Sequence, residues 1–351
     1  MNKLHFDLKK RKRYLNKAVK PVKIRPGKGV SDLLKRMGDT GFQGKNLSGA
    51  ADVWEEMLRT RTLVFFGLAG AMVPAGMREV LVYLIKHRFI DCLVSTGANL
   101  FHDIHETLGS CHWQGDHNID DNELRDAGLD RMYDVYGVEE EFNDSDKYIY
   151  EFAGGLDRRP YTTREFLSLM GRDLSKRTKT DGILTSAFKS GVHVYCPAVA
   201  DSSIGIALAL QDGKDHFIFD LIGDVKETAH MAASAKDSGV IYVGGGTPKN
   251  FIQQTEVTAD LMCRKVKGHK YAMQITADAP HWGGLSGCTF EEAVSWGKIS
   301  KKSRHVTVNT DATIALPIIV TALAERMKGF KRTLPVIDFK NSYRVKKRLF
   351  D

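Results

Sequence analysis

Lys298 is the residue of this chain whose type and setting most directly suggest chemistry. It follows Trp296 and Gly297 at the end of the run EEAVSWGK, residues 291–298, and residues 282–290 before it carry no charge. An apolar pocket disfavours an ammonium group and leaves an amine able to attack a carbonyl or imine carbon. A surface lysine, with its stem on apolar surface, is the common alternative in a chain with 51 Lys and Arg residues. The other segments decide between the two.

Residues 244–246 are a glycine triplet between an apolar run and a helical pattern near residue 249. Glycines let the main chain approach a phosphate closely, and the N–H groups at a helix start attract its charge. A tight structural turn explains the triplet equally well. Three more turns of small residues follow other apolar runs, at 67–71, 96–99 and 309–312. Together they suit an extended anionic cofactor such as a dinucleotide, with Asp311 either on a ribose or capping a helix.

Four histidines lie close in sequence, at His102, His105, His112 and His117. His102 and His105 share a helix face at nearly metal-ligand spacing, but no HExxH motif or Cys/His quartet accompanies them. We therefore expect structural or substrate-contact roles and no metal. A serine hydrolase is not expected either, because the chain has no GxSxG elbow.

Short apolar runs alternate with helical patterns from residue 62 onward. Strands are expected at 62–66, 90–95, 192–196, 216–221, 240–243, 271–275 and 305–309, and helices near 76–88, 99–109, 161–173, 225–236, 249–262 and 312–328. Strands buried on both faces that alternate with helices predict an α/β fold. The fold class is a Rossmann-like parallel sheet with helices on both faces and an N-terminal helical extension.

The N-terminal extension is predicted from two patterns. An amphipathic stretch covers residues 29–37, and Ser48 is expected to cap a helix that runs to about residue 60. The acidic segment 138–146 is expected to be a surface excursion. No linker rich in Pro, Gly or Ser divides the chain, so one domain is the simpler expectation.

The composition favours a folded cytoplasmic protein. Hydrophobic residues make up 42% and charged residues 27%, and no apolar run approaches the roughly 18 residues of a membrane span. The N-terminus is too basic for a secretory signal. The five cysteines are scattered without a CxxC pair, which fits free thiols in a reducing compartment.

The net charge of +8 is concentrated at the two ends. Residues 1–25 carry ten Lys or Arg against one Asp, residues 340–351 carry five against one Asp, and the remainder is net negative. We expect a basic arm at 1–25, a single catalytic domain at 26–339 and a basic tail at 340–351. The region between the ends carries no nucleic-acid-binding signature, so we do not expect nucleic acid as a partner.

Several ordered segments resemble the deoxyhypusine synthase family. They are residues 40–43 (TGFQ), 76–79 (GMRE), 123–125 (ELR), 197–198 with Asp201, 244–246, 286–287, 292–298 (EAVSWGK) and 311–312. The resemblance implies a homotetramer with NAD in each site and sites assembled between paired subunits. It also implies a reaction in which a polyamine such as spermidine is oxidised to an imine. Lys298 then takes the aminobutyl group as an enzyme imine and passes it to an acceptor amine, a protein lysine or a small diamine.

The resemblance also assigns residues by position. Lys298 is the catalytic nucleophile. NAD would lie against Gly70, Ala71, Thr96, Gly97, Asp201, Gly245, Thr276, Asp311 and Ala312. The amine substrate would lie against His102, Asn250, Trp282, Glu292 and Trp296. The basic N-terminal arm corresponds to a region that can cover a neighbouring subunit's entrance in the family.

The substrate positions depart from the family pattern. Acids or a histidine of the family are replaced by Phe101, His102, Ile206, Asn250, Trp282 and Leu285, while Glu292, Asp103 and Asp278 remain. Because a polycation needs carboxylates, each worth roughly 1.5–3 kcal/mol, the donor and the acceptor can differ from those of the family. The alternatives are a spermidine-dependent synthase acting on a protein lysine, an enzyme like homospermidine synthase, a catalytically silent NAD-binding subunit, and an amine oxidoreductase that releases the imine.

Overall fold

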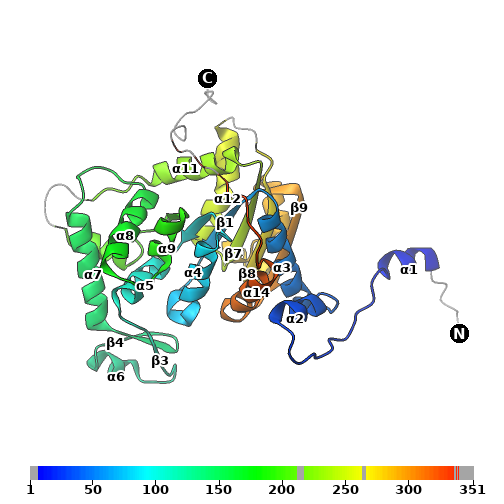
Figure 1. Cartoon of the computed structure of the whole chain (residues 1–351), viewed down its shortest axis with the longest axis horizontal. Helices are drawn as coiled ribbons and strands as arrows, with labels where there is room; N and C mark the ends of the chain where they lie inside the picture. The colour runs from blue at the N-terminus through cyan, green and yellow to red at the C-terminus, as the bar shows by residue number, and fades with distance from the viewer. Residues whose placement is uncertain (1–6, 212–216, 263–265, 336, 338, 340–351) are drawn as a thin grey trace.

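A six-stranded parallel sheet forms the centre of the molecule (Figure 1). The computed structural model describes residues 7–211, 217–262, 266–335, 337 and 339. The strands are β1 (Thr62–Leu68), β2 (Cys92–Ser95), β6 (His193–Tyr195), β7 (Asp237–Val243), β8 (His269–Thr276) and β9 (Ile299–Asn309). Their order is β6-β2-β1-β7-β8-β9, with every pair parallel. The chain order therefore reverses between β1 and β7, as in doubly wound folds.

Apolar residues on both faces explain why the central strands form. All seven residues of β1 are buried, and successive side chains point to opposite faces of the sheet. Val64 and Phe66 belong to one core cluster, whereas Leu63 and Phe65 belong to another. The sheet is thus the wall between two cores.

Helices cover both faces, which confirms the predicted fold class. The first core is covered by α2 (Val30–Met37), α3 (Phe42–Arg59), α4 (Arg78–Lys86), α5 (Gly97–Leu108), α8 (Thr163–Arg177), α9 (Ile183–Ser190) and α14 (Ala312–Arg326). The second is covered by α11 (Leu221–Ser234), α12 (Gly246–Leu261) and α13 (Phe290–Ser295). A five-residue π-helix, η1 (Val73–Met77), leads into α4.

The N-terminal extension is helical as predicted, but the predicted cap is wrong. The short helix α1 (Leu8–Tyr14) has no buried residue and lies away from the body, whereas α2 and α3 pack on α14 (Figure 1). Ser48 does not begin α3, which starts at Phe42; it lies inside the helix and is buried. The Ser48 hydroxyl faces Gly38, so packing between α2 and α3 accounts for a residue that the sequence assigned to a helix start.

Six of the seven predicted strands are confirmed, and the one at 216–221 is wrong. His216 lies outside the described residues, Phe219 makes only an isolated bridge with Tyr161, and Leu221 already begins α11. Phe217 and Phe219 pack against the rings of Tyr161 and Phe166 instead. Aromatic packing partly buries the two phenylalanines without placing the run in the sheet.

The six predicted helices after residue 62 are confirmed as α4, α5, α8, α11, α12 and α14. The predicted surface excursion at 138–146 is wrong, because residues 139–146 are the first half of the helix α7 (Glu139–Gly154), whose second half buries Tyr148, Ile149 and Ala153. Before it lies a three-stranded antiparallel sheet of β3 (Trp113–Gln114), β4 (Leu129–Met132) and β5 (Val135–Val138), with α6 (Asp121–Asp126). Also unpredicted were α9, α10 (Ser203–Ala209), α13 and the 3-10 turns η2 (Pro280–Trp282) and η3 (Leu285–Gly287).

Candidate functional site

The turns that follow five strands are joined side by side by main-chain hydrogen bonds. The N–H of Thr96 donates to Leu68, that of Ala69 to Val243, that of Gly244 to Ile275, and that of Thr310 to Thr276. These bonds link the carboxyl ends of β2, β1, β7, β8 and β9 into one continuous edge. In a doubly wound sheet, ligands bind at this edge, beside the strands where the order reverses.

The turn after β1 is clamped onto the start of α5. Asn99 is fully buried, and its Nδ2 donates to the carbonyl of Gly70 at 2.8 Å. Its Oδ1 accepts from the main-chain N–H of Met72 and Val73 at 2.8 and 3.2 Å, and the Thr96 hydroxyl also donates to Gly70. Gly70 has φ 73°, a conformation that favours glycine. Asn99, which the sequence did not single out, therefore fixes the shape of this turn.

The glycine triplet lies where the sheet order reverses. Gly244 and Gly246 have φ values of 70° and 55°, and a Cβ on Gly245 would lie 2.3 Å from the Cα of Ser286. The Ser286 hydroxyl accepts from the N–H of Gly246 at 3.1 Å. Gly245 precedes α12 and provides no side-chain cap. Gly246 donates its N–H to Ser286 and Pro248 has none, so it is the dipole at the start of α12 that would attract an anion at this edge.

Eight of the nine residues predicted to bind the cofactor follow strands of the main sheet, and Thr276 is the last residue of β8. The eight are Gly70, Ala71, Thr96, Gly97, Asp201, Gly245, Asp311 and Ala312, after β1, β2, β6, β7 and β9. The Asp311 carboxylate caps α14 by accepting from the N–H of Thr313 at 2.7 Å. The hydroxyl of Thr313, which also donates to it, holds the pKa of Asp311 below its usual value. The helix cap that the sequence left open for Asp311 is therefore present.

Lys298 lies between α13 and β9 and is half-buried. Its main-chain N–H donates to Ala293 and its carbonyl accepts from His269, the first residue of β8. Its Nζ lies 5.3 Å from the centroid of the Trp296 ring. The main chain of Lys298 is thus fixed at the amino end of β8, while the predicted cofactor turns are at the opposite edge. Among the described contacts, none joins Lys298 to those turns.

A second lysine, which the sequence did not single out, is the more deeply buried amine. Lys249 is fully buried in the first turn of α12. Its Nζ donates to Gln274 Oε1 at 2.9 Å and to the carbonyl of Cys288 at 2.6 Å. Burial lowers the pKa of Lys249 to about 8; Lys298 lowers it further, whereas Cys288 and Glu292 oppose this. The two lysines therefore act on one another electrostatically. The signal in the sequence was a lysine three residues after the glycine triplet.

His102 belongs to a cluster with the histidines of α5 and of the segment after it. Its Nδ1 lies 2.9 Å from Nε2 of His112, and the His112 Nδ1 lies 2.8 Å from the Glu106 carboxylate. The rings of His102, His105 and His112 surround Phe142 of α7. Burial lowers the pKa of His102 to about 3, and the neighbouring histidines add to this shift. Within the described residues, no group of three His, Cys, Asp or Glu side chains could hold a metal.

The other predicted substrate residues lie in separate surroundings. Asn250 lines a hollow of about 180 Å³ between α11 and α12, whereas Trp282 and Trp296 are exposed at 77% and 66%. Glu292 is exposed on α13. One copy of the chain therefore does not gather His102 and Asn250 around Lys298.

Asp103 does not remain available for a polycationic substrate, contrary to the expectation from the sequence. Its carboxylate is fully buried and accepts from Arg78 Nε at 2.9 Å. It also accepts from the main-chain N–H of Ile183 and Leu184 at 2.7 and 3.1 Å. Asp103 thus joins α4, α5 and α9 and is structural.

These features define a class of protein before any relative is considered. A doubly wound parallel sheet with glycine turns where its order reverses is a Rossmann-like α/β fold with a ligand edge. The family model for deoxyhypusine synthase matches residues 32–323. The chain belongs to the deoxyhypusine synthase family, and this membership supports an aminobutyl transferase activity.

Curated relatives match along most of the chain. "Probable deoxyhypusine synthase 2" of Methanosarcina mazei is 49% identical over 329 residues, which cover 93% of this chain and 95% of the relative. The protein of the same name from Archaeoglobus fulgidus is 50% identical over 288 residues, covering 82% and 95%. The "Deoxyhypusine synthase-like protein" of Elusimicrobium minutum is 35% identical, covering 92% and 88%.

A solved structure supports the fold. A protein from Entamoeba histolytica, assigned as a deoxyhypusine synthase, superposes with a TM-score of 0.61 at 17% identity. The match covers 90% of this chain and 99% of that protein. Among the described residues, no helix has both the length and the apolar character needed to cross a membrane.

Proposed function

We propose that the protein is an NAD-dependent aminoalkyl transferase that carries the transferred group on Lys298. The observation that carries the proposal is the family segment ending at Lys298, combined with glycine turns gathered where the sheet order reverses. The half-buried position of Lys298 suits a nucleophile that must reach a substrate. Lys249 is fully buried and donates hydrogen bonds to two acceptors, so it is not available as the nucleophile.

The carboxyl edge of the sheet fits a dinucleotide. The start of α12 and the glycine turn held by Asn99 place a helix dipole and closely approachable main chain where a pyrophosphate would bind. Gly70, Ala71, Thr96, Gly97, Asp201, Gly245, Thr276, Asp311 and Ala312 are the residues that would hold NAD. When bound, NAD would accept a hydride from the donor amine and return it to the final product.

The chain's own chemistry is the transfer between amines. The neutral amine of Lys298 adds to the imine carbon of the oxidised donor, and the bond to the departing amine breaks. The aminoalkyl group is then held as an imine on Lys298. An acceptor amine adds to the same carbon, the bond to Lys298 breaks, and the lysine is regenerated. The transfer needs a site that keeps water from the imine.

Lys249 helps to position the segment that leads to Lys298. Its bond to the Cys288 carbonyl holds the segment between η3 and α13, which leads directly to Lys298. Gln274 accepts from Lys249 and donates to the carbonyls of Gly244 and Ser286. One set of hydrogen bonds therefore links the glycine turn to the segment before the nucleophile.

The donor is proposed to be a polyamine or a related amine, and a small diamine acceptor is as well supported as a protein lysine. His102 is uncharged at neutral pH and Asp103 is paired with Arg78, so fewer carboxylates are left for a polycation than in the family pattern. Glu292 and Asp278 remain, with Trp282 and Trp296 as exposed aromatic surfaces. Trp296 can hold an ammonium group over its ring, as it does Lys298.

Assembly belongs to the same proposal. His102 and Asn250 lie apart from Lys298 in one chain, which favours a site completed by a second copy. A homotetramer with sites between subunits, in the cytoplasm, fits both the separation of these residues and the family. A measurement of the mass of the protein in solution tests the proposed tetramer.

Trapping the enzyme imine tests the function. The protein is incubated with NAD and, separately, with spermidine, putrescine or agmatine, then reduced with cyanoborohydride and digested. We expect added mass on the peptide that contains Lys298, its absence from Lys298→Ala, and its presence in the control Lys301→Ala. No adduct with any amine, despite bound NAD, would reject the transfer. NADH accumulation without transfer would indicate an amine oxidoreductase, and biological activity retained by Lys298→Ala would indicate a silent subunit.

A further inference from the structure

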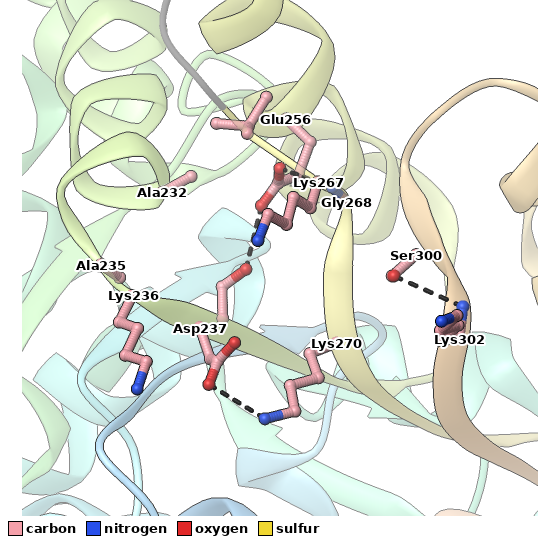
Figure 2. Close-up of a pocket in the computed structure, with 12 residues that line it drawn as sticks. Ala232, Ala235, Lys236, Asp237, Glu256, Lys267, Gly268, Lys270, Ser300 and Lys302 are labelled. Atoms are coloured by element: carbon pink, nitrogen blue, oxygen red, sulfur yellow. Dashed lines mark hydrogen bonds and ion pairs between the residues drawn. The ribbon is translucent and has the colours of Figure 1, made fainter.

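A basic pocket opens at the amino-terminal edge of the sheet, opposite the glycine turns. It encloses about 240 Å³ among the starts of β7, β8 and β9 and the ends of α11 and α12 (Figure 2). Four lysines line it: Lys236, Lys267, Lys270 and Lys302. They come from three segments, before β7, around the start of β8 and in β9, so it is the fold that gathers the charge.

Three of these lysines are left without a carboxylate partner in the described part of the chain. Lys270 pairs with Asp237 at 3.0 Å, whereas no carboxylate lies at ion-pair distance from Lys236, Lys267 or Lys302. The pocket therefore keeps a local excess of positive charge.

The two acids of the pocket are already engaged. Asp237 holds Lys270, as Figure 2 shows. Glu256 is buried; one oxygen accepts from the Ser238 hydroxyl at 2.9 Å and the other from the N–H of Gly268 at 3.1 Å. Because both carboxylates have donors within the protein, they offset the remaining lysines only in part.

The pocket continues into a second hollow of about 550 Å³. Both hollows are lined by Lys267, Ser300 and Lys302, and the second also by Lys301 and Trp296. A ligand with its anionic end among the lysines thus has room for an uncharged part towards an aromatic side chain. Ligand sites commonly combine enclosed volume with a few convergent charged groups.

We propose that this pocket binds a small phosphorylated ligand that carries at least two negative charges. Ammonium groups act on phosphate oxygens as point charges without a fixed geometry, which suits lysines from three separate segments. A small ligand fits better than an acidic protein, because the charges converge on a hollow. The site lies at the edge opposite the proposed cofactor turns and does not depend on the transferase proposal.

Calorimetric titration of the full chain with inorganic pyrophosphate at low ionic strength tests the site. The pocket variant is Lys236→Ser with Lys302→Ser. The control is Lys35→Ser with Lys176→Ser, two exposed lysines on α2 and α8, so both variants lose the same net charge. We expect one pyrophosphate per chain, weakened at least about tenfold in the pocket variant and less than about twofold in the control.

The titration is repeated with saturating NAD and with a polyglutamate peptide. Binding that persists with NAD and is lost only in the pocket variant supports the proposal, whatever the outcome of the transferase assays. Equal loss in both variants would overturn it, as would competition by NAD or binding of the peptide alone. No binding of pyrophosphate would also overturn it, and would leave Lys236 and Lys267 as charges that offset the helix ends before them.

Discussion

The Nζ atom of Lys249 lies 2.6 Å from the carbonyl oxygen of Cys288, which ties the first turn of α12 to the segment leading into α13. This bond joins the glycine turn to the segment that carries Lys298. Burial without a paired carboxylate makes the charged form of Lys249 costly, and its pKa falls to about 8.

The pKa of Lys249 predicts how stability changes with pH. Between pH 8 and the unfolded value of 10.5, the unfolded chain binds a proton that the folded chain has released. The contribution of Lys249 to the free energy of unfolding is therefore present at high pH and is lost as the pH falls through about 8. We expect the free energy of unfolding to rise by up to about 3 kcal/mol more in the parent than in Lys249→Met between pH 7.5 and 10. Urea titrations at both pH values measure it.

The control for this experiment is Lys35→Met, on the exposed face of α2. It should keep the pH dependence of the parent, since its ammonium is solvated in both states. Equal slopes in Lys249→Met and the parent would contradict a buried, weakly protonated Lys249.

The proposed nucleophile has a sharper test in Lys298→Arg. This change keeps the positive charge over Trp296 but removes an amine that can form an imine. We expect kcat for transfer to fall at least about a thousandfold, as for loss of a nucleophile, while NAD affinity changes less than about twofold. Product analysis by mass spectrometry and NAD titration measure the two effects. Retained transfer would show that another group carries the substrate, and Lys301→Arg is the matched control.

The main sheet could be predicted from sequence because its strands are buried on both faces. Runs such as 62–66 and 240–243 are apolar at successive positions, a pattern that few other elements produce. The same rule failed at 216–221, where Phe217 and Phe219 are partly buried against Tyr161 and Phe166 and not between neighbouring strands. The start of α3 was missed because contact between Ser48 and α2 is tertiary.

The candidate site was predictable where a motif or a turn carried the signal. The predictions for Lys298 and the glycine triplet rest on such signals. Lys249 was not, because what distinguishes it is burial beneath β8 and the Cys288 segment, which lies about forty residues further along. Asp103 was counted among the acids that remain because its partner Arg78 lies on another helix. Burial and partners decide these roles, and neither is visible in a local pattern.

Asn99 is predicted to control the turn at Gly70. Asn99→Ala removes the acceptor of two main-chain N–H groups and a donor to Gly70, and buried groups left unpaired cost about 1–3 kcal/mol each. We expect NAD to bind about tenfold or more weakly, with a lower melting temperature. Fluorescence titration with NAD and thermal denaturation measure this. The exposed Asn143→Ala on α7 is the control, and unchanged NAD affinity in Asn99→Ala would place the cofactor elsewhere.

Arg332 is predicted to hold the segment after α14 to the sheet. Its guanidinium bonds both oxygens of the fully buried Asp91 at 3.0 and 2.6 Å, and the carbonyl of Thr62 at 2.7 Å. Removing one member of a buried pair costs about 3–5 kcal/mol, although Arg88 still contacts Asp91. We expect Arg332→Met to lose about 3 kcal/mol of stability in urea unfolding. The exposed Arg172→Met is the comparison, and an equal effect in both would argue against the pair.

His102 is predicted to make the protein sensitive to acid. Its Nδ1 lies 2.9 Å from the Nε2 of His112, so protonation of both would place two cations in contact. Burial lowers the pKa of His102 from 6.5 to about 3. Between these two pH values, His102 is therefore protonated in the unfolded chain and neutral in the folded chain. Stability from this group is present above pH 6.5 and is lost as pH falls towards 3.

The change that tests this is His102→Gln, which keeps a polar group facing His112. Between pH 7 and 4.5, we expect the parent to lose up to about 2 kcal/mol more unfolding free energy than the variant, discounted because the imidazole is not fully buried. Urea titrations at three pH values give the slopes. His117→Gln, at an exposed site, should lose stability as the parent does. If His102→Gln kept the slope of the parent, the acid sensitivity would lie in His105, whose pKa burial also lowers.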